Sequence, residues 1–259
     1  NNKYGNFPSY SIAWNAHKEN FWGRDWVLND LKLRVSYGTL GNDRIGTYRY
    51  QANPMVVVSS ILNEDGEPED VVGYAKNTLA NPYLKWETSK QLNLGLDFGL
   101  LNNRIFGSVD VYQTTTTDLL LPEIIPIING YQSYVTNIGE TRNSGIEVTL
   151  KGTVLELGNF KWNTLINWAT NRNEIVRLNR TGPNGEALDD EANGWFIGQD
   201  INEIYNYKYL GVWQEDEADQ AQLYGQVPGD AKFLDVNEDN NITPGADRVF
   251  LGNPTPDWY

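Results

Sequence analysis

Strict alternation of apolar and polar residues is the feature of this sequence that most limits its fold. From Gln91 to Phe98, large apolar residues occupy every second position, and polar or small residues occupy the positions between them. Successive side chains of a β-strand point to opposite faces, so this stretch predicts a strand with one apolar and one polar face. Residues 101–104 read Leu-Asn-Asn-Arg, and Asn tolerates the positive φ of tight turns. A second strand is expected from Ile105 to about Thr116, which completes a hairpin.

The same alternation recurs along the chain. It is present at Leu31–Tyr37 and Gly145–Val154, and it returns after a Gly158-Asn159 turn, where Trp162 and Trp168 share a face. Helical periodicity is scarce, and the pattern predicts roughly eight strands. The sequence therefore indicates an all-β protein.

Three long segments carry no clear period. They span residues 38–82, 118–143 and 179–256 and hold most of the prolines. Loops longer than about 15 residues are uncommon in compact domains. Short turns at one end and long loops at the other are typical of an outer-membrane β-barrel. Such barrels carry girdles of aromatic residues at the membrane interfaces, and Trp162 and Trp168 are the candidates for this role here. A soluble β-sandwich with long loops uses the same alternation, so the pattern alone leaves both alternatives open.

Charge and composition exclude several classes of protein. The chain has 20 basic and 34 acidic residues, a net charge of -14, which would repel nucleic-acid phosphates, so no nucleic-acid partner is expected. It contains no cysteine, hence no disulfide, thiolate metal site or cysteine nucleophile. The sequence has no run of about 18 apolar residues that would form a membrane-spanning helix.

Several stretches, in their order along the chain, resemble the SusC/RagA family of TonB-dependent transporters. They are Leu-Lys-Leu-Arg-Val-Ser-Tyr-Gly at 31–38, Asn-Pro-Tyr-Leu-Lys-Trp-Glu-Thr at 81–88, Asn-Ile-Gly at 137–139, Asn-Ser-Gly-Ile-Glu at 143–147, Gly-Asp-Ala-Lys-Phe-Leu-Asp-Val-Asn at 229–237 and Gly-Asn-Pro-Thr-Pro at 252–256. The resemblance covers nearly the whole chain at about the family spacing.

The resemblance implies a function as well as a fold. It implies an outer-membrane transporter of a Bacteroidetes-type bacterium, with a SusD-like lipoprotein lid and energy from a TonB-ExbB-ExbD complex. The expected activity is active import of oligomeric nutrients, glycan or peptide fragments, by a protein in contact with outer-membrane lipid. The alternative is a soluble or surface β-rich carbohydrate-binding module.

The resemblance also implies the extent of the domain. Residues 1–259 are expected to be one part of a β-barrel domain, that is, a partial transmembrane antiparallel β-barrel with long extracellular loops. The plug domain and the final strands are expected to lie outside the chain. Two observations favour such a piece: Asn1 is not a Met, and Tyr259 falls where a strand would begin.

One loop has the spacing of a calcium site. Oxygen-bearing side chains stand at the first, third, fifth and seventh positions of a stretch that resembles the start of an EF-hand or dockerin loop, and such loops surround a hard cation with oxygen ligands. Two positions depart from that pattern. Asn240 replaces Gly at the sixth, and Ala246 replaces Glu at the twelfth, where the following Asp would have to substitute. The candidate ligands are Asp235, Asn237, Asp239, Asn241 and Asp247. A loop of Asx-turns with solvated carboxylates is the alternative.

No catalytic residue is expected. His17 is the sole histidine and cannot form a His-pair metal site, and the acidic runs 189–191 and 215–217 lie in charge-rich loop sequence. We therefore predict that the protein is not an enzyme. Loop aromatics could stack on sugar rings or pack within the loops, and no substrate-binding residue can be assigned. These aromatics are Trp195, Tyr205, Tyr207, Tyr209 and Trp213.

Overall fold

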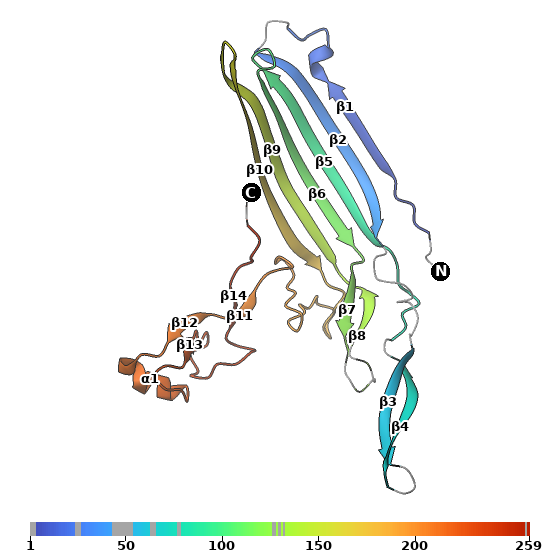
Figure 1. Cartoon of the computed structure of the whole chain (residues 1–259), viewed down its shortest axis with the longest axis vertical. Helices are drawn as coiled ribbons and strands as arrows, with labels where there is room; N and C mark the ends of the chain where they lie inside the picture. The colour runs from blue at the N-terminus through green and yellow to red at the C-terminus, as the bar shows by residue number, and fades with distance from the viewer. Residues whose placement is uncertain are drawn as a thin grey trace.

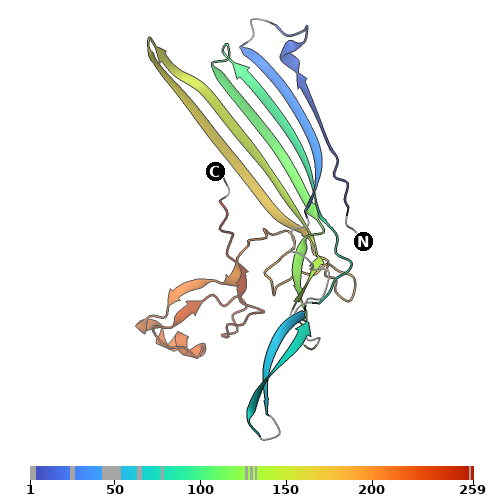
Figure 2. The same ribbon diagram turned by 45° about the vertical axis from the view of Figure 1, so that its right-hand side comes forward.

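The protein is built around a curved six-stranded antiparallel sheet (Figures 1 and 2). The computed structural model describes residues 4–23, 27–42, 54–62, 66–76, 79–125, 128, 131, 133–256 and 258–259. In spatial order the strands of the large sheet are β1 (Ser9–Asn15), β2 (Leu28–Asn42), β5 (Glu87–Leu100), β6 (Ile105–Thr117), β9 (Glu140–Leu157) and β10 (Phe160–Arg177). The prediction of an all-β fold is confirmed.

The strands of this sheet are longer than the alternating segments that predict them. β5 and β6 have 14 and 13 residues, and β9 and β10 have 18 each. The extra length comes from polar ends, such as residues 88–90 of β5, which pair with the threonines at 115–117 of β6. Threonine is β-branched and suits a strand, although it gives no hydrophobic alternation.

Tight turns join the strands at one end of the sheet. Leu101, Asn102 and Asn103 have φ values of 53°, 54° and 61°, and Gly158 has a φ of 57°. Arg104 braces the first turn against the next hairpin, because its guanidinium donates to the carbonyl oxygens of residues 153 and 154 at 2.8 and 3.1 Å. The predicted β5–β6 and β9–β10 hairpins are confirmed.

The opposite end of the sheet carries the long connections, which contain more structure than their sequence predicts. Two hairpins project there, β3 (Pro54–Leu62) with β4 (Pro68–Lys76), and β7 (Leu120–Ile124) with β8 (Ser133–Asn137) (Figure 1). The last segment forms an arm of short elements. These are β11 (Tyr205–Tyr207), β12 (Tyr209–Val212), the 3-10 helix Glu215–Glu217, α1 (Ala218–Leu223), β13 (Ala231–Phe233) and β14 (Arg248–Phe250).

Most of the buried apolar residues lie at the loop end of the sheet and in the segment that follows it. Ile138, Ile175 and Leu178 are 5%, 2% and 4% exposed, and Phe196, which packs against Tyr205 and Phe250 of the arm, is 7% exposed. The sheet itself leaves both faces open, so it has no core of its own. None of the helices in the described residues has the length and apolarity needed to cross a bilayer.

The carboxyl end of the chain returns to the free edge of β10. Tyr259 and Ala169 exchange both backbone hydrogen bonds, with N···O distances of 2.8 and 3.1 Å. This is the geometry of a directly opposed pair in an antiparallel ladder. Tyr259 thus lies beside β10 as a strand residue would, although no strand is assigned at this position.

Candidate functional site

The two faces of the sheet differ sharply in chemistry. One line of paired residues runs Leu33, Leu96, Val109, Val148 and Trp168 across five strands. Neighbouring lines on the same face are also apolar, and their side chains are widely exposed, with Val35 at 42% and Leu94 at 48%. A contiguous exposed apolar surface of this extent marks contact with a partner or a membrane.

The apolar belt crosses the strands obliquely. On β2 it runs from Leu31 to Tyr37, centred on residue 34, which lies in register with Ala169 of β10 across four strand steps. On β10 the belt runs from Trp162 to Trp168 and is therefore centred about four residues nearer the tight turns. With about 3.3 Å per residue and about 4.8 Å between strands, this shift means a strand tilt of about 35°. Transmembrane β-barrel strands tilt by about 35–45°.

The polar face carries a charged bridge that spans three strands. Arg34 of β2 donates from Nε and Nη2 to Asp97 of β5 at 2.9 and 2.8 Å, and from Nη2 to Asp110 of β6 at 2.9 Å. Gly95 lies between Arg34 and Asp110 in the ladder. A Cβ at this position would lie 2.6 Å from the guanidinium carbon. The glycine thus lets the arginine cross β5 and reach the strand beyond.

A second close contact continues the polar network toward β10. The Tyr112 hydroxyl donates to Oδ1 of Asn171 at 3.3 Å across β9. The strand residue beneath it is Gly145, where a Cβ would meet the Tyr112 hydroxyl at 2.6 Å and the carbonyl oxygen of Thr170 at 2.5 Å. Glycine inside a strand commonly marks such a close approach. The sequence offers this signal at both glycines, since each interrupts a run of larger residues.

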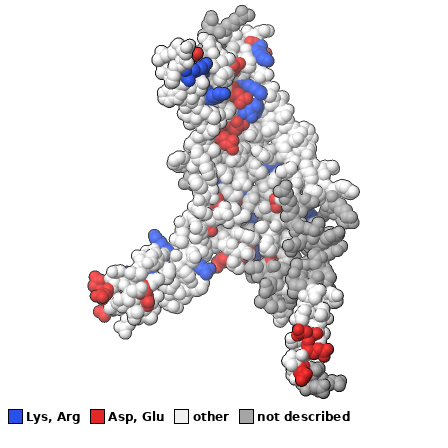
Figure 3. Space-filling view, viewed as in Figure 1, with Lys and Arg blue, Asp and Glu red and all other residues white. Residues whose placement is uncertain are grey.

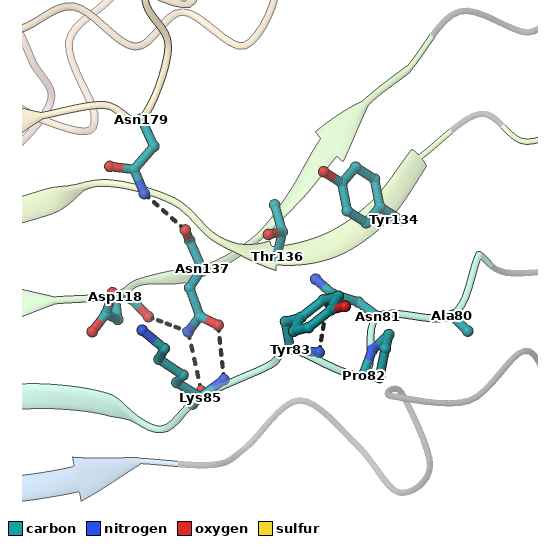
Figure 4. Close-up of a pocket in the computed structure, with 10 residues that line it drawn as sticks. All are labelled: Ala80, Asn81, Pro82, Tyr83, Lys85, Asp118, Tyr134, Thr136, Asn137 and Asn179. Carbon is teal, nitrogen blue, oxygen red and sulfur yellow. Dashed lines mark hydrogen bonds between the residues drawn. The ribbon is translucent and has the colours of Figure 1, made fainter. Parts of the chain in front are cut away.

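A pocket of about 490 Å³ lies at the base of the long connections (Figure 4). Asn137 of β8 holds its wall together: Nδ2 donates to the carbonyl oxygens of Lys85 and Asp118 at 3.0 and 2.8 Å, and Oδ1 accepts from Lys85 N at 2.8 Å. Asn81 donates to Val135 O at 3.0 Å in the same way. The pocket is lined by Ala80, Asn81, Pro82, Tyr83, Lys85, Asp118, Tyr134, Thr136, Asn137 and Asn179.

Most of the side-chain amides around this pocket form hydrogen bonds to the backbone. Asn179 also donates to the carbonyl oxygen of Asn137 at 2.9 Å, so three asparagines fix the ends of three connections. The ring of Tyr83 is 82% exposed at the opening and suits stacking on a sugar ring, whereas the Tyr134 hydroxyl is hydrogen-bonded to Glu123 and Thr136. The sequence indicates the Asn81-Pro82 turn, but the role of Asn137 depends on long-range contacts that have no periodic signal.

The structure brings the predicted calcium-loop residues into one tight turn. Asn240 has a φ of 61°, the left-handed conformation that its place in the loop requires. Asp235 accepts hydrogen bonds from the backbone of Asn240 at 2.8 Å, and Asp239 accepts one from Asn241 N at 2.8 Å. Asn237 donates to Asp239 at 2.8 Å. Their oxygens are thus used within the loop, in the manner of Asx-turns.

Asp247 closes this loop from its far end. The residue is fully buried and accepts hydrogen bonds from Val236 N at 2.9 Å and Thr243 N at 2.8 Å. These bonds, chiefly the one from Thr243, hold the pKa of Asp247 below its usual value. Among the described residues, no three His, Cys, Asp or Glu side chains are grouped as a metal site. Calcium binding by this loop stays a prediction that these contacts do not test.

The remaining candidates from the sequence have structural contacts. Nδ1 of His17 lies 3.3 Å from the backbone N of Leu31, and Nε2 lies 3.3 Å from Asp30. Among the acidic runs, Asp190 is paired with Arg180 at 2.6 Å. Glu217 is likewise paired with Lys232 at 2.6 Å, and that bond is the first cause of its lowered pKa.

The loop aromatics divide between packing and exposure. Trp213 is only 5% exposed, with Tyr224 at 5.5 Å between ring centroids and the Lys232 ammonium 4.2 Å from its own ring centroid. Tyr205 packs against Phe196 at 4.5 Å. On the sheet, Trp162 and Trp168 lie on the apolar face and are 54% and 41% exposed, and their place in a membrane girdle stays a prediction.

Comparison with known proteins identifies the family. The model of the family described as TonB dependent receptor-like, beta-barrel matches residues 1–252. TonB-dependent receptor P3 of Formosa agariphila is 39% identical over 271 aligned residues, covering 100% of this chain and 26% of that protein. TonB-dependent receptor SusC of Bacteroides thetaiotaomicron is 32% identical over 263 residues, covering 99% and 25%.

Solved structures agree with this result. The RagAB peptide transporter matches with a TM-score of 0.68 and 28% identity, covering 97% of this chain and 25% of the other. The RagAB peptide importer in its open-open state matches with a TM-score of 0.71 and 27% identity, covering 97% and 26%. This chain spans about a quarter of the length of these relatives. It belongs to the TonB-dependent receptor β-barrel family, whose members include SusC.

Proposed function

We propose that this chain forms part of the wall and the extracellular loops of an outer-membrane importer that takes up oligomeric nutrients, glycan or peptide fragments. The observation that carries the proposal is the oblique apolar belt. A flat bilayer imposes one level on every strand of a tilted sheet, so the belt shifts along the strands between one side of the sheet and the other, here between β5 and β10. The alternative, a soluble or surface β-rich carbohydrate-binding module, would cover an apolar face of this extent with a second sheet, whereas these side chains are widely exposed.

The difference between the two ends of the sheet supports an orientation in the membrane. Short turns face the periplasm and long loops face the outside in outer-membrane barrels. By this rule the pocket near Asn137 and the arm at 205–250 lie on the extracellular side, and the polar face with Arg34 faces the lumen. Nutrient captured outside would then pass the polar face, with energy from a TonB-ExbB-ExbD complex and capture by a SusD-like lipoprotein lid.

Two neighbouring residues on opposite faces provide the test. Ile166 lies near the centre of the apolar belt on β10, whereas Asn167 lies on the polar face opposite Thr149. An arginine on the lipid face costs about 2–4 kcal/mol at the bilayer midplane. In the full-length protein, Ile166→Arg should reduce the amount of folded barrel in outer membranes and the uptake of substrate. Asn167→Arg, the matched control, should leave the amount of folded barrel near normal.

The outcome that rejects the proposal is recovery of the full-length protein in a soluble fraction without detergent, with equal tolerance of both arginines. The substrate class needs a separate measurement, namely uptake of labelled peptide and oligosaccharide mixtures by cells with and without the protein. The RagAB structures concern a peptide importer, which makes peptides the first mixture to test.

A further inference from the structure

The apolar face of the sheet ends, on the side of the loops, in a row of basic side chains. On β5 the belt ends at Leu92, and Lys90 is the next residue on the same face. On β10 the belt ends at Trp168, and Arg172 lies four residues further along the same face. Arg142 of β9 lies between the two strands, in register with Lys90 through one residue of β6. With about 3.3 Å per residue, Lys90 and Arg172 lie about 7 and 13 Å beyond the belt, so they border it rather than interrupt it.

Two of these basic residues have no acidic partner. Glu140 and Glu174 lie on the same part of the face, and each is paired with an arginine, at N···O distances of 3.8 and 3.0 Å. Lys90 and Arg172 form no ion pair within the part of the chain that the structure describes, and both side chains are exposed. The border of the belt thus carries unneutralised positive charge.

This positive charge is a local feature of an acidic protein. The chain has a net charge of -14, and acidic side chains gather at the tip of the β3–β4 hairpin and at the far end of the arm (Figure 3). Composition alone would place acids at the border of the belt as well. The basic border therefore points to a ligand of negative charge at this level of the sheet.

A groove of about 450 Å³ opens beside Lys90. Phe7 and Trp86 line it, with 5.6 Å between their ring centroids, and Lys85 brings a second ammonium group. Asp118 also belongs to the lining, so the groove combines two lysines and one carboxylate with aromatic rings. A groove that is part cationic and part aromatic suits the head group of a lipid, which has a charged and an apolar part.

The place of the row on the sheet limits what can bind there. Lys90 and Arg172 share the face of the apolar belt, which the proposed function places against lipid. Strands that close a barrel pair with the edges of the sheet and leave this face uncovered. Just beyond the hydrocarbon region a bilayer presents lipid head groups, in which negative charge is carried by phosphate.

We propose that Lys90 and Arg172 form a rim that binds the phosphate groups of lipids in the extracellular leaflet of the outer membrane. Arg142, which is half engaged by Glu174, lies in the middle of this rim. The inference rests on the proposed function and adds to it a ligand chemistry for the outer surface of the wall. It does not depend on the nutrient that is carried.

Native mass spectrometry of the full-length protein in detergent tests the proposal. Phosphatidic acid and diacylglycerol with the same acyl chains are the two probes, because they differ only in the phosphate. The parent protein should retain phosphatidic acid in preference to diacylglycerol. Lys90→Gln and Arg172→Gln should each weaken this retention about fivefold, since one basic residue near a membrane surface contributes about this factor. Lys90→Arg should retain the lipid as the parent does.

Lys151→Gln is the matched control. Lys151 is an exposed lysine of β9 on the polar face of the sheet, so its loss should leave retention unchanged. The proposal is overturned by equal retention of both lipids, by retention that survives Lys90→Gln and Arg172→Gln, or by an equal loss in Lys151→Gln. Displacement of the lipid by an equal concentration of inorganic phosphate would also overturn it, because the ligand would then be free phosphate.

The amount of folded barrel and the uptake of substrate, measured in the same variants, separate this inference from the proposed function. A parent protein that inserts and transports but retains no phosphatidic acid rejects the lipid rim and leaves the importer standing. Recovery of the parent in a soluble fraction without detergent rejects the importer first, before any lipid is added.

Discussion

The bridge from Arg34 across Gly95 provides the most specific quantitative prediction. Replacement of Gly95 by alanine puts a methyl group 2.6 Å from the guanidinium carbon. The guanidinium must then move by about 1 Å to reach ordinary van der Waals separation. Its bonds to Asp97 and Asp110, at 2.8–2.9 Å, cannot both survive that movement.

The magnitude follows from two opposing effects. A hydrogen bond to a charged group contributes about 1.5–3 kcal/mol, and the side chains here are 20–37% exposed, which reduces the loss to about 1 kcal/mol. Alanine in a strand gains about 0.5 kcal/mol over glycine. Gly95→Ala should therefore lower the free energy of unfolding by about 0.5 kcal/mol when Arg34 is present. It should stabilise by about the same amount in an Arg34→Gln background, where no guanidinium crosses the strand.

Unfolding rates of the full-length protein in detergent measure this difference. At one fixed temperature, Gly95→Ala should unfold about 2.3-fold faster in the parent and about 2.3-fold slower in Arg34→Gln, a coupling of about fivefold if the bridge is broken in the transition state. Gly38→Ala is the control, because a Cβ there lies 3.5 Å from its nearest neighbour, an ordinary contact. The reasoning is refuted if Gly95→Ala has the same effect in both backgrounds or if Gly38→Ala reproduces it.

Three further predictions concern the loop end. Asn137→Ala removes the side-chain oxygen that accepts a hydrogen bond from the Lys85 backbone amide. Hydrogen exchange of that amide should rise about 30-fold, which is equivalent to about 2 kcal/mol. Unchanged exchange would contradict the role of Asn137 in holding the pocket wall together. Because the pKa of Asp247 is lowered in the folded loop, its stabilising effect is present above the usual value of 3.8 and is lost as pH falls through the lower, folded value. Digestion of the loop by pepsin should thus increase at the acid end of a pH series, and Asp247→Asn should remove that pH dependence. If the loop at 235–247 binds calcium, added Ca²⁺ should protect its amides from exchange, EGTA should reverse this, and Asp239→Ala should abolish the difference; equal exchange with Ca²⁺ and EGTA rejects the site.

The sequence predicts the large sheet because alternation is a local signal. Gln91–Phe98 and Leu31–Tyr37 each assign their own side chains to a face, whatever they pair with. The β3–β4 hairpin has no such signal, because Val56, Val57 and Val58 are consecutive and place apolar side chains on both faces. Asn137 escapes for a different reason, since its partners lie 19 and 52 positions away in the sequence.

The oblique course of the belt shows what register adds to alternation. The sequence of each strand shows that the strand has an apolar face. It does not show where the apolar segment begins along the strand relative to the apolar segment of the neighbouring strand. The ladder supplies the level: Arg34 lies in register with Ala169, although the apolar segment of β10 is centred nearer residue 165. A second sheet packed on this face would lie with its strands at about 30° to these strands and would cover their apolar side chains, which are widely exposed here. A planar lipid slab meets tilted strands at successively shifted positions, and the shift observed here corresponds to the tilt that such barrels adopt. The distinction between a sandwich and a membrane wall is therefore contained in the pairing of the strands, which depends on the same residues but appears only once the sheet has formed.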